Sequence, residues 1–138
     1  MINFEIQEFN SPDLENSGIN MDAAFLQMLD DARGISGIPF NITSGYRTKN
    51  RNKLVGGVAN SSHLVGKAAD ISVQSGNERY IIINALIKAG FNVLVWRKPS
   101  YIVTTIRLNK VEQNPILFGH TNTVGSTLWT RKSSKTHK

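Results

Sequence analysis

The sequence predicts an α+β domain in which helices pack on a small, mostly antiparallel sheet. Two observations indicate this class. Three segments have the spacing of helices, and they alternate with short segments in which Val, Ile and Thr dominate. The last segments of the chain are strand-like without helices between them, which favours antiparallel pairing there. At 138 residues, the chain fits a single domain.

The expected helices cover residues 22–33, 48–55 and 77–90. The first carries Phe25, Met28, Leu29 and Ala32 on one face, and Asn20 or Asp22 can cap its start. The third is expected to turn Tyr80, Ile83, Leu86 and Ile87 inward and to stop at Gly90.

The expected strands cover residues 40–44, 68–73, 92–96, 101–107 and 115–118. Pro99 and Ser100 suit a turn between the third and fourth of these strands. The two strands would then form an antiparallel hairpin.

Charge and composition exclude several classes of protein. No apolar run reaches 18 residues, so no membrane-spanning helix is expected, and the acidic N-terminus does not have the pattern of a signal peptide. There are no cysteines, so a zinc site would have to use His, Asp or Glu. The net charge of +6 is concentrated in two basic clusters, 47–53 and 131–138. These favour anionic partners, and nucleic acid is not excluded.

His63 and Asp70 are the first candidate site residues. They lie seven positions apart, with Gly66 and two alanines between them. Zinc accepts one imidazole and one carboxylate readily, but a catalytic zinc needs three protein ligands. On this spacing alone, a structural hydrogen bond between the two side chains remains the alternative.

The sequence around this pair resembles the zinc D-Ala-D-Ala carboxypeptidases and related peptidoglycan endopeptidases, the VanY and LAS-type metallopeptidases. The matching pieces are "SGYRT", "KLVGG", "NSSH" and "GKAADI". Outside them, "EFNSPD", "GIPF" and "NALIKAGFN" are similar to the small phage and prophage members, and the resemblance covers roughly residues 8–117. It implies the LAS metallopeptidase fold, shared with hedgehog domains.

The resemblance also implies roles for individual residues. His63 and Asp70 match the first two zinc ligands. Arg47 matches an arginine that faces the substrate and stabilises the oxyanion, which suits the fixed donors of a guanidinium. Ser61 matches a small polar residue that holds the polar ends of the substrate.

One segment departs from the family pattern. The third ligand is expected in a late strand of the type aromatic–Ile/Val–His–Val–Asp, and the corresponding residues here begin at Tyr101. Val103 then occupies the histidine position and Thr105 the last position. A valine cannot bind a metal and a threonine cannot act as a base near neutral pH. His120 is the possible substitute for the third ligand, since His137 lies next to the C-terminus and Glu78 and Glu112 are expected to face solvent. Zinc is expected to be absent or weakly bound.

The expected organisation is a peptidase-like domain over residues 1–119 and a basic tail over residues 120–138. Trp129, Arg131 and Lys132 are candidate docking residues of the tail. We therefore expect a catalytically impaired domain that serves as a structural or adaptor protein of a phage, in the virion or the host cytoplasm. Two alternatives stay open: an active zinc peptidase with a substituted third ligand, and a module that binds peptidoglycan without cutting it.

Overall fold

The computed structural model describes residues 1–91, 93–97, 101–105, 116–120 and 129–130, with side chains described as far as residue 91. The helices are α1 (Ala23–Ser36), α2 (Lys49–Leu54) and α3 (Gly76–Ala89), with short 3-10 turns η1 (Ile6–Phe9), η2 (Ser17–Asn20) and η3 (Ser62–Val65). The strands are β1 (Asn41–Ser44), β2 (Ala68–Ser72), β3 (Val93–Arg97), β4 (Tyr101–Thr105), β5 (Ile116–His120) and β6 (Trp129–Thr130). The turn expected at Pro99 and Ser100 lies outside the described residues.

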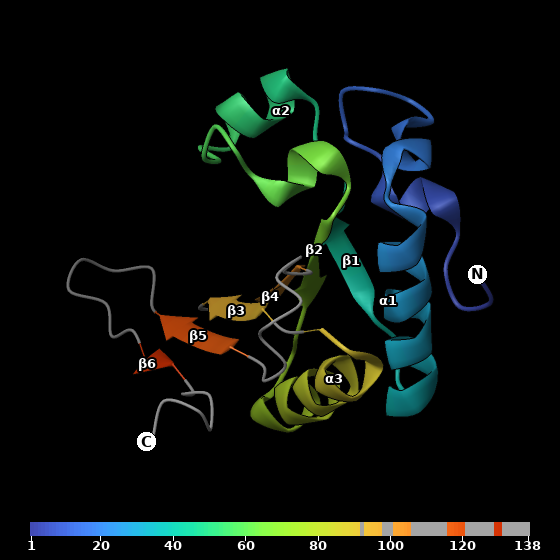
Figure 1. Cartoon of the computed structure of the whole chain (residues 1–138), viewed down its shortest axis with the longest axis vertical. Coiled ribbons are helices and arrows are strands. Elements are labelled where there is room, and N and C mark those ends of the chain that lie inside the picture. The colour runs from blue at the N-terminus through green and yellow to red at the C-terminus, as the bar shows by residue number, and fades with distance from the viewer. Residues whose placement is uncertain (92, 98–100, 106–115, 121–128, 131–138) are drawn as a thin grey trace.

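The described strands form one sheet in the order β1-β2-β4-β3-β5-β6 (Figure 1). All neighbouring pairs are antiparallel except β3 and β5, which run parallel. The predicted α+β class with a mostly antiparallel sheet is therefore confirmed. The sheet also enters the segment assigned to the tail, because β5 extends to His120 and β6 pairs with it.

Both long helices begin within one residue of the prediction and α3 ends as predicted, but α1 runs to Ser36, three residues beyond the predicted end, because the left-handed glycine that closes it is Gly37. The side chain of Asp22 accepts a hydrogen bond from the Phe25 N–H at 2.9 Å and so caps α1. Gly90 follows α3 with a φ of 110°. The predicted inward position of Tyr80 is wrong, because its exposed fraction is 68%. The helix instead buries Ile82, Ala85 and Leu86, whose spacing defines a face that leaves Tyr80 outside.

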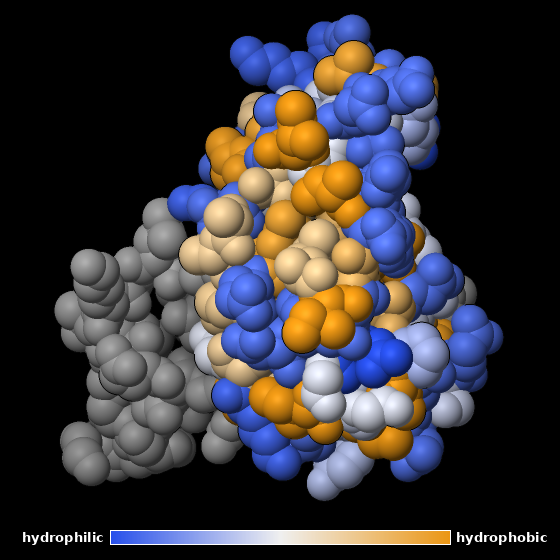
Figure 2. Space-filling view, turned by 90° about the vertical axis from the view of Figure 1, so that its right-hand side faces the viewer, coloured by the Kyte–Doolittle hydropathy of each residue, from blue (hydrophilic) through white to orange (hydrophobic). Residues whose placement is uncertain are grey.

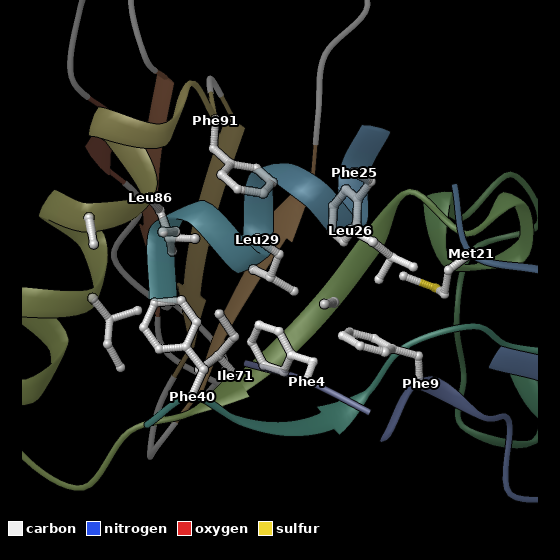
Figure 3. Close-up of a cluster of buried hydrophobic side chains, with 14 of the residues drawn as sticks. Phe4, Phe9, Met21, Phe25, Leu26, Leu29, Phe40, Ile71, Leu86 and Phe91 are labelled. Carbon is white, nitrogen blue, oxygen red and sulfur yellow. The ribbon is translucent and has the colours of Figure 1, made fainter. Parts of the chain in front are cut away.

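An aromatic core lies between the helices and one face of the sheet (Figure 3). Phe25 of α1 meets Phe91, which follows α3, edge to face with ring centroids 5.5 Å apart. Phe4 and Phe9, from the N-terminal segment, make a second edge-to-face pair at 5.5 Å. The N-terminal residues therefore belong to the core and are not a loose extension.

The outer face on the α1 side mixes apolar and polar side chains (Figure 2). Several large apolar side chains are exposed in the described part, among them Ile2, Ile19, Leu54 and Val58. Within residues 1–91 and the described strands, no helix is long and apolar enough to cross a membrane.

Strand β2 is buried along most of its length and divides its residues between two environments. Ala69 and Ile71 belong to the hydrophobic core. Because successive side chains of a strand point to opposite faces, the intervening Asp70 points away from that core. The carboxylate of Asp70 instead meets His63 of η3 and Arg47, which precedes α2.

Candidate functional site

Three charged or titratable side chains meet on the outer face of β2. Asp70 comes from the strand itself, His63 from η3, and Arg47 from the segment between β1 and α2. The structure thus brings together the three residues that the sequence analysis singled out as the core of a site. All three are largely buried, with side-chain exposures of 12% for Asp70, 5% for His63 and 15% for Arg47.

A backbone carbonyl fixes the orientation of the His63 ring. Nδ1 lies 2.7 Å from the carbonyl oxygen of Gly45. A carbonyl only accepts hydrogen bonds, so Nδ1 carries the proton and Nε2 is the nitrogen left free in the neutral ring. Gly45 has to be a glycine, since a Cβ there would lie 2.7 Å from the Cα of Phe9.

His63 directs this free nitrogen at the carboxylate of Asp70. Nε2 lies 3.1 Å from Oδ1 of Asp70. Nevertheless Oδ1 is a buried oxygen without a hydrogen-bond partner among the described residues. In the neutral tautomer, two lone pairs therefore face each other with no proton between them. A histidine whose Nδ1 donates to a backbone carbonyl, which leaves Nε2 without a proton, has the orientation found at metal ligands.

Arg47 supplies the positive charge of the site. Its Nη2 lies 3.5 Å from Oδ2 of Asp70, while its Nε donates to the Ser44 hydroxyl at 3.2 Å. Its Nη1 donates to Oδ1 of Asn52 at 3.2 Å. These contacts fix the guanidinium at three nitrogens, so the arginine is held in place before any ligand arrives.

Asn52 was not singled out by the sequence analysis, although it lies in the "KLVGG" region that carries the resemblance. It is a buried residue of α2, and its Nδ2 donates to the Val58 carbonyl at 2.8 Å. Gly57 packs directly on it, because a Cβ at Gly57 would come within 2.0 Å of Asn52 Oδ1. An asparagine shortly before the glycine pair at 56 and 57 was the signal available in the sequence, whereas its burial is known only from the structure.

Ser61 makes a hydrogen bond within the protein that does not depend on a ligand. Its hydroxyl oxygen accepts a hydrogen bond from the His63 N–H at 3.2 Å and caps η3. The hydroxyl proton is not used in this bond and remains available as a donor. The substrate-binding role of Ser61 stays a prediction.

The register of the sheet identifies the backbone position opposite Asp70. On the neighbouring strand β4, Asp70 is paired with Val103, and Ala68 is paired with Thr105. Directly paired Cα atoms in an antiparallel ladder lie about 4.5–5.5 Å apart. Position 103 is therefore the ladder position on β4 nearest the carboxylate, and position 105 lies two residues further along the same strand.

The other candidate residues lie elsewhere in the sheet or outside the described part. His120 pairs with Arg97 on β3, so two strands separate its backbone from β2. At a spacing of about 4.8 Å per strand, the two backbones are roughly 14 Å apart, too far for side chains that share one metal. Trp129 lies in β6, and Arg131 and Lys132 lie outside the described residues.

The described side chains supply two possible ligands of a zinc ion, which is fewer than a catalytic zinc site needs. His63 offers a nitrogen free of a proton, and Asp70 offers an oxygen free of hydrogen bonds. The described residues contain no group of three His, Asp or Glu side chains that could hold a metal. A catalytic zinc needs three protein ligands, and a valine at position 103 has no donor atom.

Comparison with known protein families gives one match. Residues 3–102 match the family described as Peptidase M15. The matched range includes Arg47, His63 and Asp70 and ends one residue before Val103. No curated protein matches the chain.

Proposed function

Because this chain belongs to the Peptidase M15 family, we propose that it is a peptidase-like domain whose catalysis is impaired by an incomplete metal site. The pairing of Asp70 with Val103 carries this proposal. A third ligand on β4 would have to come from the ladder position opposite the carboxylate, and that position holds a valine. The half-site of His63 and Asp70 then binds zinc weakly or not at all.

The contacts of Arg47 explain how the domain stays folded without a metal. A buried carboxylate with no compensating charge is costly. Here the Arg47 guanidinium lies 3.5 Å from Asp70 and is itself held by Ser44 and Asn52. The ion pair therefore compensates the charge of Asp70, and the fold does not depend on zinc.

The residue at position 105 adds to the impairment. A peptidase of this type needs a group that takes a proton from the attacking water. Thr105 occupies the ladder position opposite Ala68, and a threonine hydroxyl does not ionise near neutral pH. Restoring a metal ligand alone would thus leave the proton transfer without a base.

We further propose that the domain serves as a structural or adaptor component of a phage particle, in the virion or the host cytoplasm. The resemblance to small phage members supports this role. So does the basic segment 120–138, which carries Arg131, Lys132, Lys135 and Lys138 and no acidic residue. Such a segment is suited to an acidic surface on a neighbouring structural protein, with Trp129 as an apolar anchor.

A second candidate function is binding of peptidoglycan without cleavage. The observation that favours it is the held Arg47, whose five N–H donors exceed the contacts it makes within the described part. Ser61 also retains a free hydroxyl proton.

Two measurements on the purified chain test the proposed impairment. Zinc content after dialysis should fall well below one ion per chain, and peptides ending in D-Ala-D-Ala should not be hydrolysed. Hydrolysis that a chelator abolishes would contradict the proposal. Sedimentation of the chain with purified peptidoglycan separates the two non-catalytic roles, since binding that is lost in Arg47→Ala supports the second candidate.

A further inference from the structure

The last quoted piece that resembles the family, "NALIKAGFN", ends at Asn92, and the net charge of the chain differs on the two sides of this point. Residues 1–92 contain eight Lys or Arg and nine Asp or Glu, a net charge of −1, whereas residues 93–138 contain eight and one, a net charge of +7. The two candidate ligands before this point keep their geometry: Gly45 holds the ring of His63, and Asp70 Oδ1 has no hydrogen-bond partner among the described residues. Both missing groups, at positions 103 and 105, come after it. Substitutions acquired one at a time would be scattered, whereas a change of reading frame alters every residue beyond one point.

We infer that the nucleotides encoding residues 93–106 carry the missing ligand in the reading frame that begins one base earlier. The genetic code allows this to be tested from the amino acids alone. Each shifted codon consists of the last base of one codon and the first two bases of the next. A Tyr codon ends in C or T and an Ile codon begins with AT, so Tyr101 and Ile102 give CAT or TAT. The shifted frame therefore places a histidine or a tyrosine at position 102, whatever codons are used.

The neighbouring positions follow the same rule. The last base of the Val103 codon and the first two bases of the Thr104 codon give AAC, CAC, GAC or TAC. Position 104 of the shifted frame therefore reads Asn, His, Asp or Tyr. Position 101 reads Leu, Ile or Val. Position 100 reads Phe, Leu, Ile or Val when Ser100 uses a codon that begins with TC. The shifted frame thus accommodates the aromatic, aliphatic, His and Asp residues of the family pattern at positions 100, 101, 102 and 104, while position 103 reads Cys, Arg or Ser in place of the Val.

The remaining frame does not accommodate this order. Its codons take the last two bases of one residue and the first base of the next. The codons of Tyr101 and Ile102 then combine to encode Thr or Ile. The codons of Ile102 and Val103 combine to encode Ser, Leu or a stop. The result is therefore specific to one of the two alternative frames.

The sheet explains how such a segment would complete the site. Strand β4 is the neighbour of β2, and the present register pairs Asp70 with position 103. The shifted frame also replaces residues 98–100, which connect β3 to β4, and a hairpin connection sets the register of its strands. A shift of one residue brings position 102 opposite Asp70. A histidine there would be the third donor beside His63 and Asp70, and an Asp at position 104 would replace the missing carboxylate.

The nucleotide sequence of the gene tests the inference first. We expect the codon of Tyr101 to be TAC, the codon of Val103 to be GTG, and Pro99 and Ser100 to be encoded by CCT followed by a codon beginning with TC. The shifted frame should contain no stop codon over these residues. A TAT codon at Tyr101, any last base other than G at Val103, or a stop codon in the shifted frame would overturn the inference.

The protein product gives the second test. Duplicating the last base of the Asn92 codon places everything after it in the shifted frame. The inference predicts that this product retains about one zinc per chain after dialysis, and that His63→Ala in the same background abolishes the retention. A product with normal helical circular dichroism but no zinc would overturn it, and if the product does not fold, the codons decide. The inference rests on the roles proposed for His63 and Asp70, and it opposes the adaptor role, because residues 120–138 lie beyond the same change of frame. Zinc retained by the unshifted chain would contradict the proposed impairment while leaving the codon test unaffected.

Discussion

His63 and Asp70 lie 3.1 Å apart, between Nε2 and Oδ1, yet no hydrogen bond satisfies this buried oxygen among the described residues. The carbonyl of Gly45 holds the only proton of the neutral ring on the far nitrogen. The pair is therefore arranged to receive a positively charged species between its two atoms.

Gly45→Ala should destabilise the fold. The added methyl group would lie within 3.0 Å of three backbone and side-chain atoms of Phe9, and overpacking of this kind costs about 1–3 kcal/mol. Thermal unfolding measures the effect. Gly34→Ala is the matched control, because Gly34 lies in α1 with open space around it. That change should stabilise the protein by about 0.5–1 kcal/mol, and equal effects of the two substitutions would contradict the close packing at Gly45.

Asn52→Ala should lower the free energy of unfolding by about 1–3 kcal/mol. The substitution leaves the Val58 carbonyl and the Nη1 donor of Arg47 without the partners that Asn52 provides. Chemical denaturation measures the loss. Asn50→Ala on the same helix is the control, because Asn50 is exposed and should change stability by less than about 0.5 kcal/mol. A similar small effect at Asn52 would show that this residue does not hold Arg47.

Asp30 should make stability depend on pH in the acid range. Burial raises the pKa of Asp30, but the N–H groups of Asn3 and Ile2 that bond to the carboxylate outweigh it and hold the pKa below the ordinary 3.8. A lowered folded-state pKa stabilises the protein above the unfolded pKa, and this stabilisation is lost as the pH falls through the folded value. The stability difference between wild type and Asp30→Asn should therefore be largest near neutral pH and shrink below about pH 4.

The control for this titration is Asp31→Asn, at an exposed neighbouring position. Its effect on stability should be small throughout. An Asp30→Asn deficit that stays constant from pH 7 to pH 2.5 would contradict the role assigned to the ionised carboxylate.

Deleting residues 121–138 should leave the core helices intact and abolish incorporation into a particle or complex. The aromatic core is built from residues 4–91, so the helical circular dichroism should be unchanged. The deletion also removes β6, which pairs with β5, so a small loss of stability is compatible with the account. Co-purification with phage particles measures incorporation, and normal assembly of the truncated chain would remove the main support for the adaptor role.

The sequence was sufficient to predict much of the fold. Helix α1 and its cap at Asp22 could be predicted because apolar spacing and a capping residue coincide there. Tyr80 was misplaced because an amphipathic aromatic residue fits either face of a helix when the neighbouring isoleucines fill both. The extension of β5 to His120 was not predicted, since Gly119 read as a strand end.

The site was predictable in part. The resemblance singled out Arg47, His63 and Asp70, and the structure places them together. It did not single out Asn52 or Gly45, because their contribution is a hydrogen bond and a close approach that depend on the folded geometry. The pairing of Asp70 with position 103 likewise comes from the strand register, which the sequence alone left open.

Restoring the missing groups should restore metal binding. Val103→His with Thr105→Asp places a nitrogen donor at the ladder position opposite Asp70 and a carboxylate two residues away. Zinc retained after dialysis should rise toward one ion per chain. Adding His63→Ala to the double variant should reverse the gain, and retention that survives this change would locate the zinc elsewhere.

The most direct test of the central claim is the zinc content of the unaltered chain after exhaustive dialysis, measured by elemental mass spectrometry. An incomplete site of His63 and Asp70 predicts far less than one zinc per chain, with no difference between wild type and His63→Ala. One zinc per chain that is retained by wild type and lost in His63→Ala would show that the site is complete, and would contradict the proposed impairment.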